Sequence, residues 1–197
     1  MKFAPDETRF EFRIFAPDLS SVRDALAAMA QGNQLPESRE TYIVTRLNIE
    51  SNVKIRGGRL QVKTLQARRG LLDQWARPLD AEFPVSVADI ESIVLPALGL
   101  DLEIGERGAL VESALLALLG DQHALATIDV VKQRTLYDTA DCVAEFTHLT
   151  IGDDAMETVA IEAADPLAAE ALMQKIGIAD TQNDSYAEFL QRRLFQT

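Results

Sequence analysis

The sequence predicts a single α+β domain dominated by antiparallel strands. Alternation of apolar and polar residues, which is typical of half-buried strands, recurs along most of the 197 residues. The pair Gly57-Gly58 separates two such segments and favours a two-residue hairpin. No repeat, low-complexity tract or linker divides the chain. We therefore expect one domain over 1–197, with an insertion-like helical segment around 100–122.

The first predicted strand, 9–15, shows the alternation most clearly. Phe10, Phe12 and Ile14 fall on one face, and the other face carries charged side chains. A strand with one apolar face packs that face on a core. Further strands are predicted over 41–49, 53–56, 59–65, 74–84, 127–136, 142–150 and 157–163.

Apolar residues at helical spacing predict helices over 20–30, 87–98, 109–119 and 166–176, and a short one over 185–193. We expect Ser20 or Ser21 to cap the first helix and Gly32-Asn33 to end it. Asp165 is expected to cap 166–176, with Pro166 in its first turn. The 109–119 segment is very apolar, so it is either an additional core helix or a surface for a protein partner.

Composition excludes several classes of function. The chain has 19 Lys and Arg against 31 Asp and Glu, a net charge of −12. This charge argues against a protein that coats nucleic acid and against an anionic membrane surface as partner. Cys142 is the single cysteine, which fits a reducing compartment, and no apolar run reaches transmembrane length. We expect a cytoplasmic protein.

The basic residues are concentrated in one part of the chain. Residues 54–69 hold six basic residues and no acidic residue. This stretch is either the solvated face of a hairpin or a local anion site, depending on where its side chains point. Lys54 and Arg56 share a strand face, as do Lys132 and Arg134. If the sheet is flat, these faces are exposed to solvent. If the sheet closes into a barrel, they line a lumen, and a polyanion together with a divalent metal would balance its charges.

The order of these motifs resembles the CYTH superfamily, the triphosphate tunnel metalloenzymes. The family's Glu-x-Glu-x-Lys strand is similar to Arg9-Phe10-Glu11-Phe12-Arg13, and its Leu-Arg-x-Arg strand to Val53-Lys54-Ile55-Arg56. Four further motifs follow in the family's order. They are a strand ending in Lys63, a Lys-x-Arg strand (Lys132-Gln133-Arg134), an acidic strand with Glu145 and a strand with Glu162. The resemblance implies an antiparallel β-barrel, the triphosphate tunnel, with flanking helices.

The resemblance also implies roles for individual residues. Glu11, Lys63 and Glu162 would be catalytic, and Mg²⁺ or Mn²⁺ would be held by Glu11, Glu145 and Glu162. The phosphate-binding residues would be Arg9, Arg13, Lys54, Arg56, Lys63, Lys132 and Arg134. The chain departs from the family pattern, since Arg9 and Ala160 stand where carboxylates are expected, Arg13 replaces a lysine, and Glu145 occupies what is commonly an Asp position. Asp80 and Glu82 are candidate replacement ligands.

Three functions remain open at this point. The first is a divalent-metal-dependent phosphohydrolase acting on inorganic or organic triphosphate. The second is a polyphosphate- or nucleotide-binding module that kept the basic tunnel and lost efficient catalysis. The third is an interaction protein that uses the 109–119 helix as a partner face. A small-molecule triphosphate or polyphosphate is the expected partner, and a homodimer is a further expectation.

Overall fold

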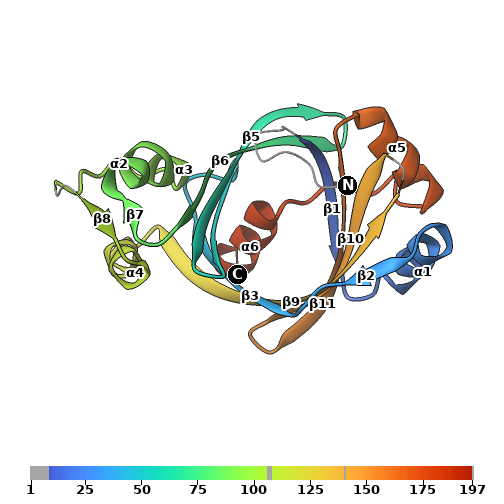
Figure 1. The fold of residues 1–197 in the computed structure, drawn as a ribbon, viewed down its shortest axis with the longest axis horizontal. Coiled ribbons are helices and arrows are strands. Elements are labelled where there is room, and N and C mark those ends of the chain that lie inside the picture. The colour runs from blue at the N-terminus through green and yellow to red at the C-terminus, as the bar shows by residue number, and fades with distance from the viewer. Residues whose placement is uncertain (1–8, 106–107, 140, 197) are drawn as a thin grey trace. The chain divides into compact units, whose positions relative to one another are not determined.

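The computed structural model describes residues 9–105, 108–139 and 141–196 (Figure 1). The larger strands are β1 (Arg9–Ala16), β3 (Ser38–Thr45), β4 (Ser51–Arg56), β5 (Arg59–Arg69), β6 (Leu72–Glu82), β9 (Leu125–Asp138), β10 (Cys142–Ile151) and β11 (Asp154–Ala163). The short strands are β2 (Gly32–Gln34), β7 (Val85–Ser86) and β8 (Ala109–Leu110). The helices are α1 (Ser20–Met29), α2 (Val87–Asp89), the π-helical turn η1 (Ile90–Val94), α3 (Leu95–Ala97), α4 (Glu112–Gly120), α5 (Pro166–Lys175) and α6 (Tyr186–Phe195).

Within the described residues, the strands pair in the order β10-β11-β1-β6-β5-β4-β3-β9-β2, and β10 also pairs with β9. This additional pairing joins the two ends of the eight-strand order from β10 to β9, so the hydrogen bonding closes into a ring. Every pairing with a described register is antiparallel. The predicted antiparallel β-barrel with flanking helices is confirmed.

Contacts divide the chain into two compact units. The first unit comprises Met1–Ser38, Leu65–Ala76 and Val130–Ser185, and the second comprises Arg39–Thr64, Arg77–Asp129 and Tyr186–Thr197. The expectation that 1–197 forms a single domain stays a prediction.

In the first unit, α1 and α5 cover one face of the sheet formed by β1, β10 and β11 (Figure 1). Phe12, Ile14 and Phe146 on that face are buried against Leu26 of α1 and Leu172 of α5. Burying apolar side chains of this size stabilises a fold by roughly 1.5–3 kcal/mol each. The helices therefore cover the apolar face of the sheet. The charged side chains of β1, which alternate with the apolar ones, point to the opposite face.

In the second unit, the apolar face of β3, β4 and β5 carries Ile43, Val53 and Leu60, all buried. Leu115 and Leu119 of α4 belong to the same cluster and are 0% and 1% exposed. Of the two alternatives for the 109–119 segment, the structure shows the core helix. Its first residues are not helical, because Ala109 and Leu110 form β8 against β7.

Two local predictions were wrong. Neither Ser20 nor Ser21 caps α1: Leu19 is the N-cap residue, and its N–H donates to the Glu157 carboxylate of β11. A tertiary contact thus replaces the local cap. Gly32 and Asn33 do not end α1, which stops at Met29 with Ala30 as its C-cap residue, but form β2 against β9.

Other local predictions were confirmed. Gly57 and Gly58 have φ values of 57° and 73°, as a hairpin turn with two left-handed residues requires. Asp165 accepts a hydrogen bond from the Leu167 N–H at the start of α5. Across the described residues, every helix falls short of the length and apolarity that a membrane crossing requires.

Candidate anion-binding site

The polar face of the first unit gathers residues from strands that are far apart in sequence. Residues directly opposite each other in a ladder share a face. Arg13 of β1 lies opposite Ala160 of β11, which lies opposite Glu145 of β10. In the neighbouring row, Glu11 lies opposite Glu162 on one side and opposite Asp73 of β6 on the other. The sequence-predicted Glu11, Arg13, Glu145 and Glu162 therefore share one face.

Arg13 is the centre of this face. Its Nε donates to Glu11 Oε1 at 3.1 Å, and its Nη1 lies 3.7 Å from Glu145 Oε1 and 3.4 Å from Thr158 Oγ1. The Arg13 side chain is only 8% exposed. A charge this deeply buried needs partners, and two carboxylates supply them. Thr147 adds a hydrogen bond to Glu145 Oε1 at 3.2 Å.

Two of the departures from the family pattern are physically linked. Ala160 lies between Arg13 and Glu145 in the row of the sheet, and its side chain ends at Cβ. Neighbouring strands are about 4.8 Å apart, so Glu145 is two strand spacings from Arg13. A long guanidinium side chain crosses this gap over a small alanine. The arginine and the alanine therefore fit each other, and a bulky Glu at 160 would compete for the same space.

Arg9 and Glu162 form a second ion pair on this face, with Nη1 and Oε2 3.1 Å apart and both side chains partly exposed. Asp73, opposite Glu11, is buried and lies 3.4 Å from the Arg68 Nε. Sequence reasoning missed Asp73, although it falls two residues before Trp75 and one before the predicted 74–84 strand. Alternation along 74–84 would group Asp73 with Trp75 and Leu79, so only the pairing of β6 with β1 places it opposite Glu11.

Two further predicted cations lie on β9 in the first unit. Lys132, 3% exposed, is opposite Leu149, and Arg134 is opposite Thr147. Arg134 donates from Nη2 to Ser38 Oγ at 3.0 Å. Arg134 also borders a cleft of about 630 Å³ that includes Arg23 and His148.

In the second unit, the polar face of β3, β4 and β5 holds the other predicted cations. Lys54 of β4 lies opposite Gln61, and Lys63 of β5 lies opposite Asn52, so Lys54, Arg56 and Lys63 share one face. Sequence reasoning missed their carboxylate partner, Glu40 of β3. The Glu40 Oε2 lies 2.8 Å from Lys54 Nζ, and its Oε1 lies 3.6 Å from Arg56 Nη1.

The electrostatics of this face follow from burial. Burial lowers the pKa of Lys54 from its ordinary value, and Arg56 and Lys63 lower it further because like charges repel. Glu40 opposes this shift through its charge and its hydrogen bond.

Asp80 and Glu82, the candidate replacement ligands, are both held by Arg59. Arg59 Nε lies 2.7 Å from Asp80 Oδ1, and Nη1 lies 2.8 Å from Glu82 Oε1. Burial alone would raise the pKa of Asp80, but hydrogen bonds from Arg59 and Gln61 hold it below its ordinary value. This cluster is a partly exposed ion-pair network.

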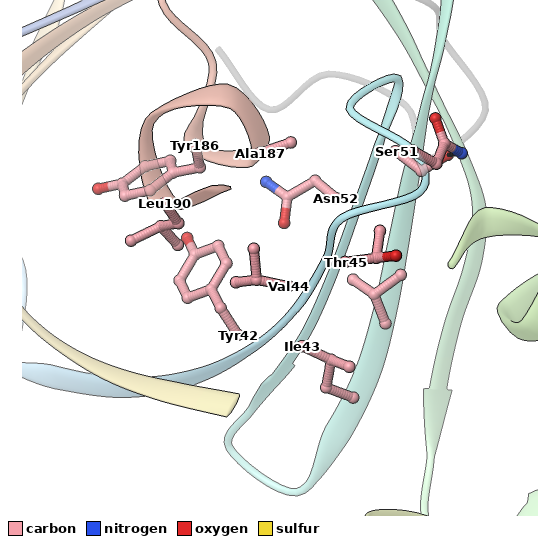
Figure 2. Close-up of a pocket in the computed structure, with 11 residues that line it drawn as sticks. Tyr42, Ile43, Val44, Thr45, Ser51, Asn52, Tyr186, Ala187 and Leu190 are labelled. Carbon is pink, nitrogen blue, oxygen red and sulfur yellow. Dashed lines mark hydrogen bonds between the residues drawn. The ribbon is translucent and has the colours of Figure 1, made fainter. Parts of the chain in front are cut away.

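Helix α6 packs on the polar face of the second unit. Figure 2 shows Tyr42 of β3 and Tyr186 of α6 side by side, with their ring centroids 5.1 Å apart. The pocket between them and Asn52 has a cavity volume of about 10 Å³. That is room for about one water molecule, so this pocket is too small for a triphosphate.

The predicted metal ligands do not form a metal cage as they stand. Glu11 and Glu145 both contact Arg13, and Glu162 contacts Arg9. In the part of the chain that the structure describes, no three Asp, Glu, His or Cys side chains are arranged to hold a metal ion. Carboxylate oxygens suit Mg²⁺ and Mn²⁺ in kind, but here these carboxylates pair with arginines.

No protein-family model matches the sequence, and no curated protein matches it. Solved structures do match in fold. A Bacillus halodurans protein described as a candidate adenylate cyclase has 12% identity and a TM-score of 0.56, and the match covers 98% of this chain and 100% of that one. The PH1012 protein of Pyrococcus horikoshii OT3 has 12% identity and a TM-score of 0.53, with 89% and 94% covered. A conserved hypothetical protein of Pyrococcus furiosus has 15% identity and a TM-score of 0.52, with 91% and 98% covered.

The fold is CYTH-like. The resemblance noted in the sequence is thus confirmed at the level of fold. The catalytic roles of Glu11, Lys63 and Glu162 stay predictions, as do the phosphate-binding roles of the seven basic residues. So does the expectation that the cations of both units face one cavity.

Proposed function

We propose that this chain binds a small-molecule triphosphate or polyphosphate through the basic side chains on the polar faces of its barrel strands. The observation that carries the proposal is that Lys54, Arg56 and Lys63 share one strand face, where the charges of Arg56 and Lys63 both lower the pKa of Lys54. Like charges held together in this way favour an anionic ligand. Ammonium and guanidinium groups are the donors that recognise phosphate oxygens.

We further propose that binding occurs without efficient turnover. Support comes from Arg9 and Arg13, which engage Glu11, Glu145 and Glu162. In metal-assisted phosphoryl transfer, divalent ions must neutralise charge that develops on the phosphate. Carboxylates that already hold arginines are poor ligands for such ions.

Metal-dependent hydrolysis is the second candidate function. One observation favours it: Asp73, Glu11 and Glu162 lie opposite one another on three neighbouring strands. If a ligand drew Arg9 and Arg13 onto its phosphates, Glu162 and Glu11 would lose these ion-pair partners. This candidate predicts phosphate release that depends on Mg²⁺ or Mn²⁺ and is reduced in Glu162→Gln.

The experiment combines binding with turnover. The protein is incubated with tripolyphosphate, ATP or thiamine triphosphate, with and without Mg²⁺ or Mn²⁺, and both the melting temperature and released phosphate are measured. We expect the melting temperature to rise with tripolyphosphate and phosphate release to stay at background. Metal-dependent release would establish the second candidate instead, and an unchanged melting temperature with all three compounds would refute binding.

Replacing Lys63 by alanine should weaken tripolyphosphate binding by about 1–3 kcal/mol, the scale of a charge-assisted hydrogen bond. Isothermal titration calorimetry measures the loss. The matched control is Lys175→Ala, which makes the same change in net charge at an exposed position in the last turn of α5. Equal affinities for both variants would remove Lys63 from the site.

A further inference from the structure

Glu40 is a carboxylate at the base of the second unit's cationic face. It is 0% exposed, and Lys54, Tyr42 and Arg56 lie around its carboxylate. Lys54 Nζ and the Tyr42 hydroxyl lie 2.8 Å and 3.1 Å from its Oε2, and Arg56 Nη1 lies 3.6 Å from its Oε1. Burying an ionised carboxylate costs several kcal/mol unless it is paired. Lys54 and Arg56 supply that pairing for Glu40.

The register explains how Glu40 reaches two cations at once. Glu40 lies directly opposite Arg56, and Tyr42 lies directly opposite Lys54, so all four side chains share one face. The hydrogen bond from Tyr42 fixes the carboxylate from its own strand. Lys54 Nζ also lies 5.6 Å from the centre of the Tyr42 ring, a cation–π distance. The carboxylate and its two cations are thus held in place on two paired strands.

Carboxylate and phosphate oxygens compete for the same donors. Both accept charge-assisted hydrogen bonds from ammonium and guanidinium groups. A ligand phosphate that approaches Lys54 and Arg56 meets a negative charge within 4 Å of both cations. It must share these donors with Glu40 or take them over, and the two anions repel each other.

We propose that Glu40 is a built-in competitor of the ligand's phosphate groups and sets the affinity of the anion site. This inference rests on the proposed binding of triphosphate or polyphosphate. Glu40 keeps Lys54 and Arg56 in place on the strands while no ligand is bound. The binding free energy of an anion then reflects only the difference between its own attraction to these cations and the attraction of Glu40 to them.

The test is Glu40→Gln, which keeps the shape and the carbonyl acceptor but removes the charge. We expect tripolyphosphate to bind about tenfold or more tightly, since a unit charge a few ångströms away is worth more than that at the effective dielectric of a partly buried site. Calorimetry measures the affinity. The control is Glu50→Gln, the same change in net charge at an exposed residue, which should leave the affinity within about twofold at moderate salt.

Glu40→Asp covers the case in which the glutamine variant does not fold. It keeps the buried charge but draws it back by one methylene, so affinity should rise by a smaller factor than in Glu40→Gln. One outcome overturns the inference alone: the wild-type protein binds tripolyphosphate, and these variants bind it equally or more weakly. Glu40 would then position Lys54 rather than compete with the ligand, and the proposed function would stand. If neither the wild type nor any variant binds, the proposed function fails and the inference fails with it.

Discussion

Replacing Arg13 by methionine is expected to lower the free energy of unfolding by about 3–5 kcal/mol. Methionine keeps much of the volume and removes the charge. Glu11 and Glu145 would then lose the guanidinium that lies 3.1 Å and 3.7 Å from their carboxylates. Leaving buried charges without a counter-charge accounts for the size of the effect. Urea denaturation at pH 7 measures it.

The matched control for Arg13→Met is Arg39→Met. Arg39 also pairs with a carboxylate, Asp129, but its side chain is 71% exposed. An exposed ion pair contributes only about 0–1 kcal/mol, so this variant should be close to wild type. Similar losses in the two variants would mean that burial of Arg13 does not matter.

Arg13→Met also tests whether the Arg13 guanidinium takes the place of a metal ion between Glu11 and Glu145. Without Arg13, the carboxylates of Glu11 and Glu145 need another cation. We therefore expect Mn²⁺ or Mg²⁺ to raise the melting temperature of Arg13→Met more than that of the wild type. An equal response in both proteins would show that these carboxylates do not bind a divalent ion even when Arg13 is gone.

Phe12→Ala should lower the free energy of unfolding by about 3–5 kcal/mol, the cost of truncating a fully buried aromatic side chain. Phe12 is 0% exposed and lies in the cluster that α1 and α5 cover. Its neighbours along the strand, Glu11 and Arg13, point to the opposite face. The loss therefore measures the packing of the helices against the sheet.

Leu167→Ala is the control for Phe12→Ala, because Leu167 is an apolar residue of α5 that is 59% exposed. It should change the unfolding free energy by less than about 0.5 kcal/mol. Denaturant unfolding of both variants gives the comparison. A loss below about 1 kcal/mol in Phe12→Ala would mean that this face of β1 is not packed as described.

Local sequence was sufficient for most of the fold. Period-two alternation in 9–15 separated Phe12 from Arg13 because successive side chains of a strand point to opposite faces. The turn at Gly57-Gly58 and the cap at Asp165 were also predictable, since both depend on the intrinsic conformational preferences of residues that are adjacent in sequence. The CYTH-like barrel came from the order of several weak motifs rather than from any one of them.

Tertiary structure decided which charges are partners. Glu40 lies just before the predicted 41–49 strand, and nothing near it in sequence indicated that it would hold Lys54 and Arg56. The alternation of Glu40, Tyr42 and Val44 was the available signal, and it indicates a face but not a partner. Likewise, the sequence showed that Arg9 and Ala160 depart from the family pattern. It did not show that Arg13 crosses Ala160 to reach Glu145, because this contact depends on the pairing of β1, β11 and β10.

The amino-acid sequence by itself determined the longer strands, their apolar and charged faces, and the surplus of cations in 54–69. Only the tertiary structure decided that the charged faces are largely buried and that carboxylates neutralise their arginines and lysines. The reason is that a strand's periodicity is a property of its own backbone, whereas the register between strands depends on contacts across the whole sheet.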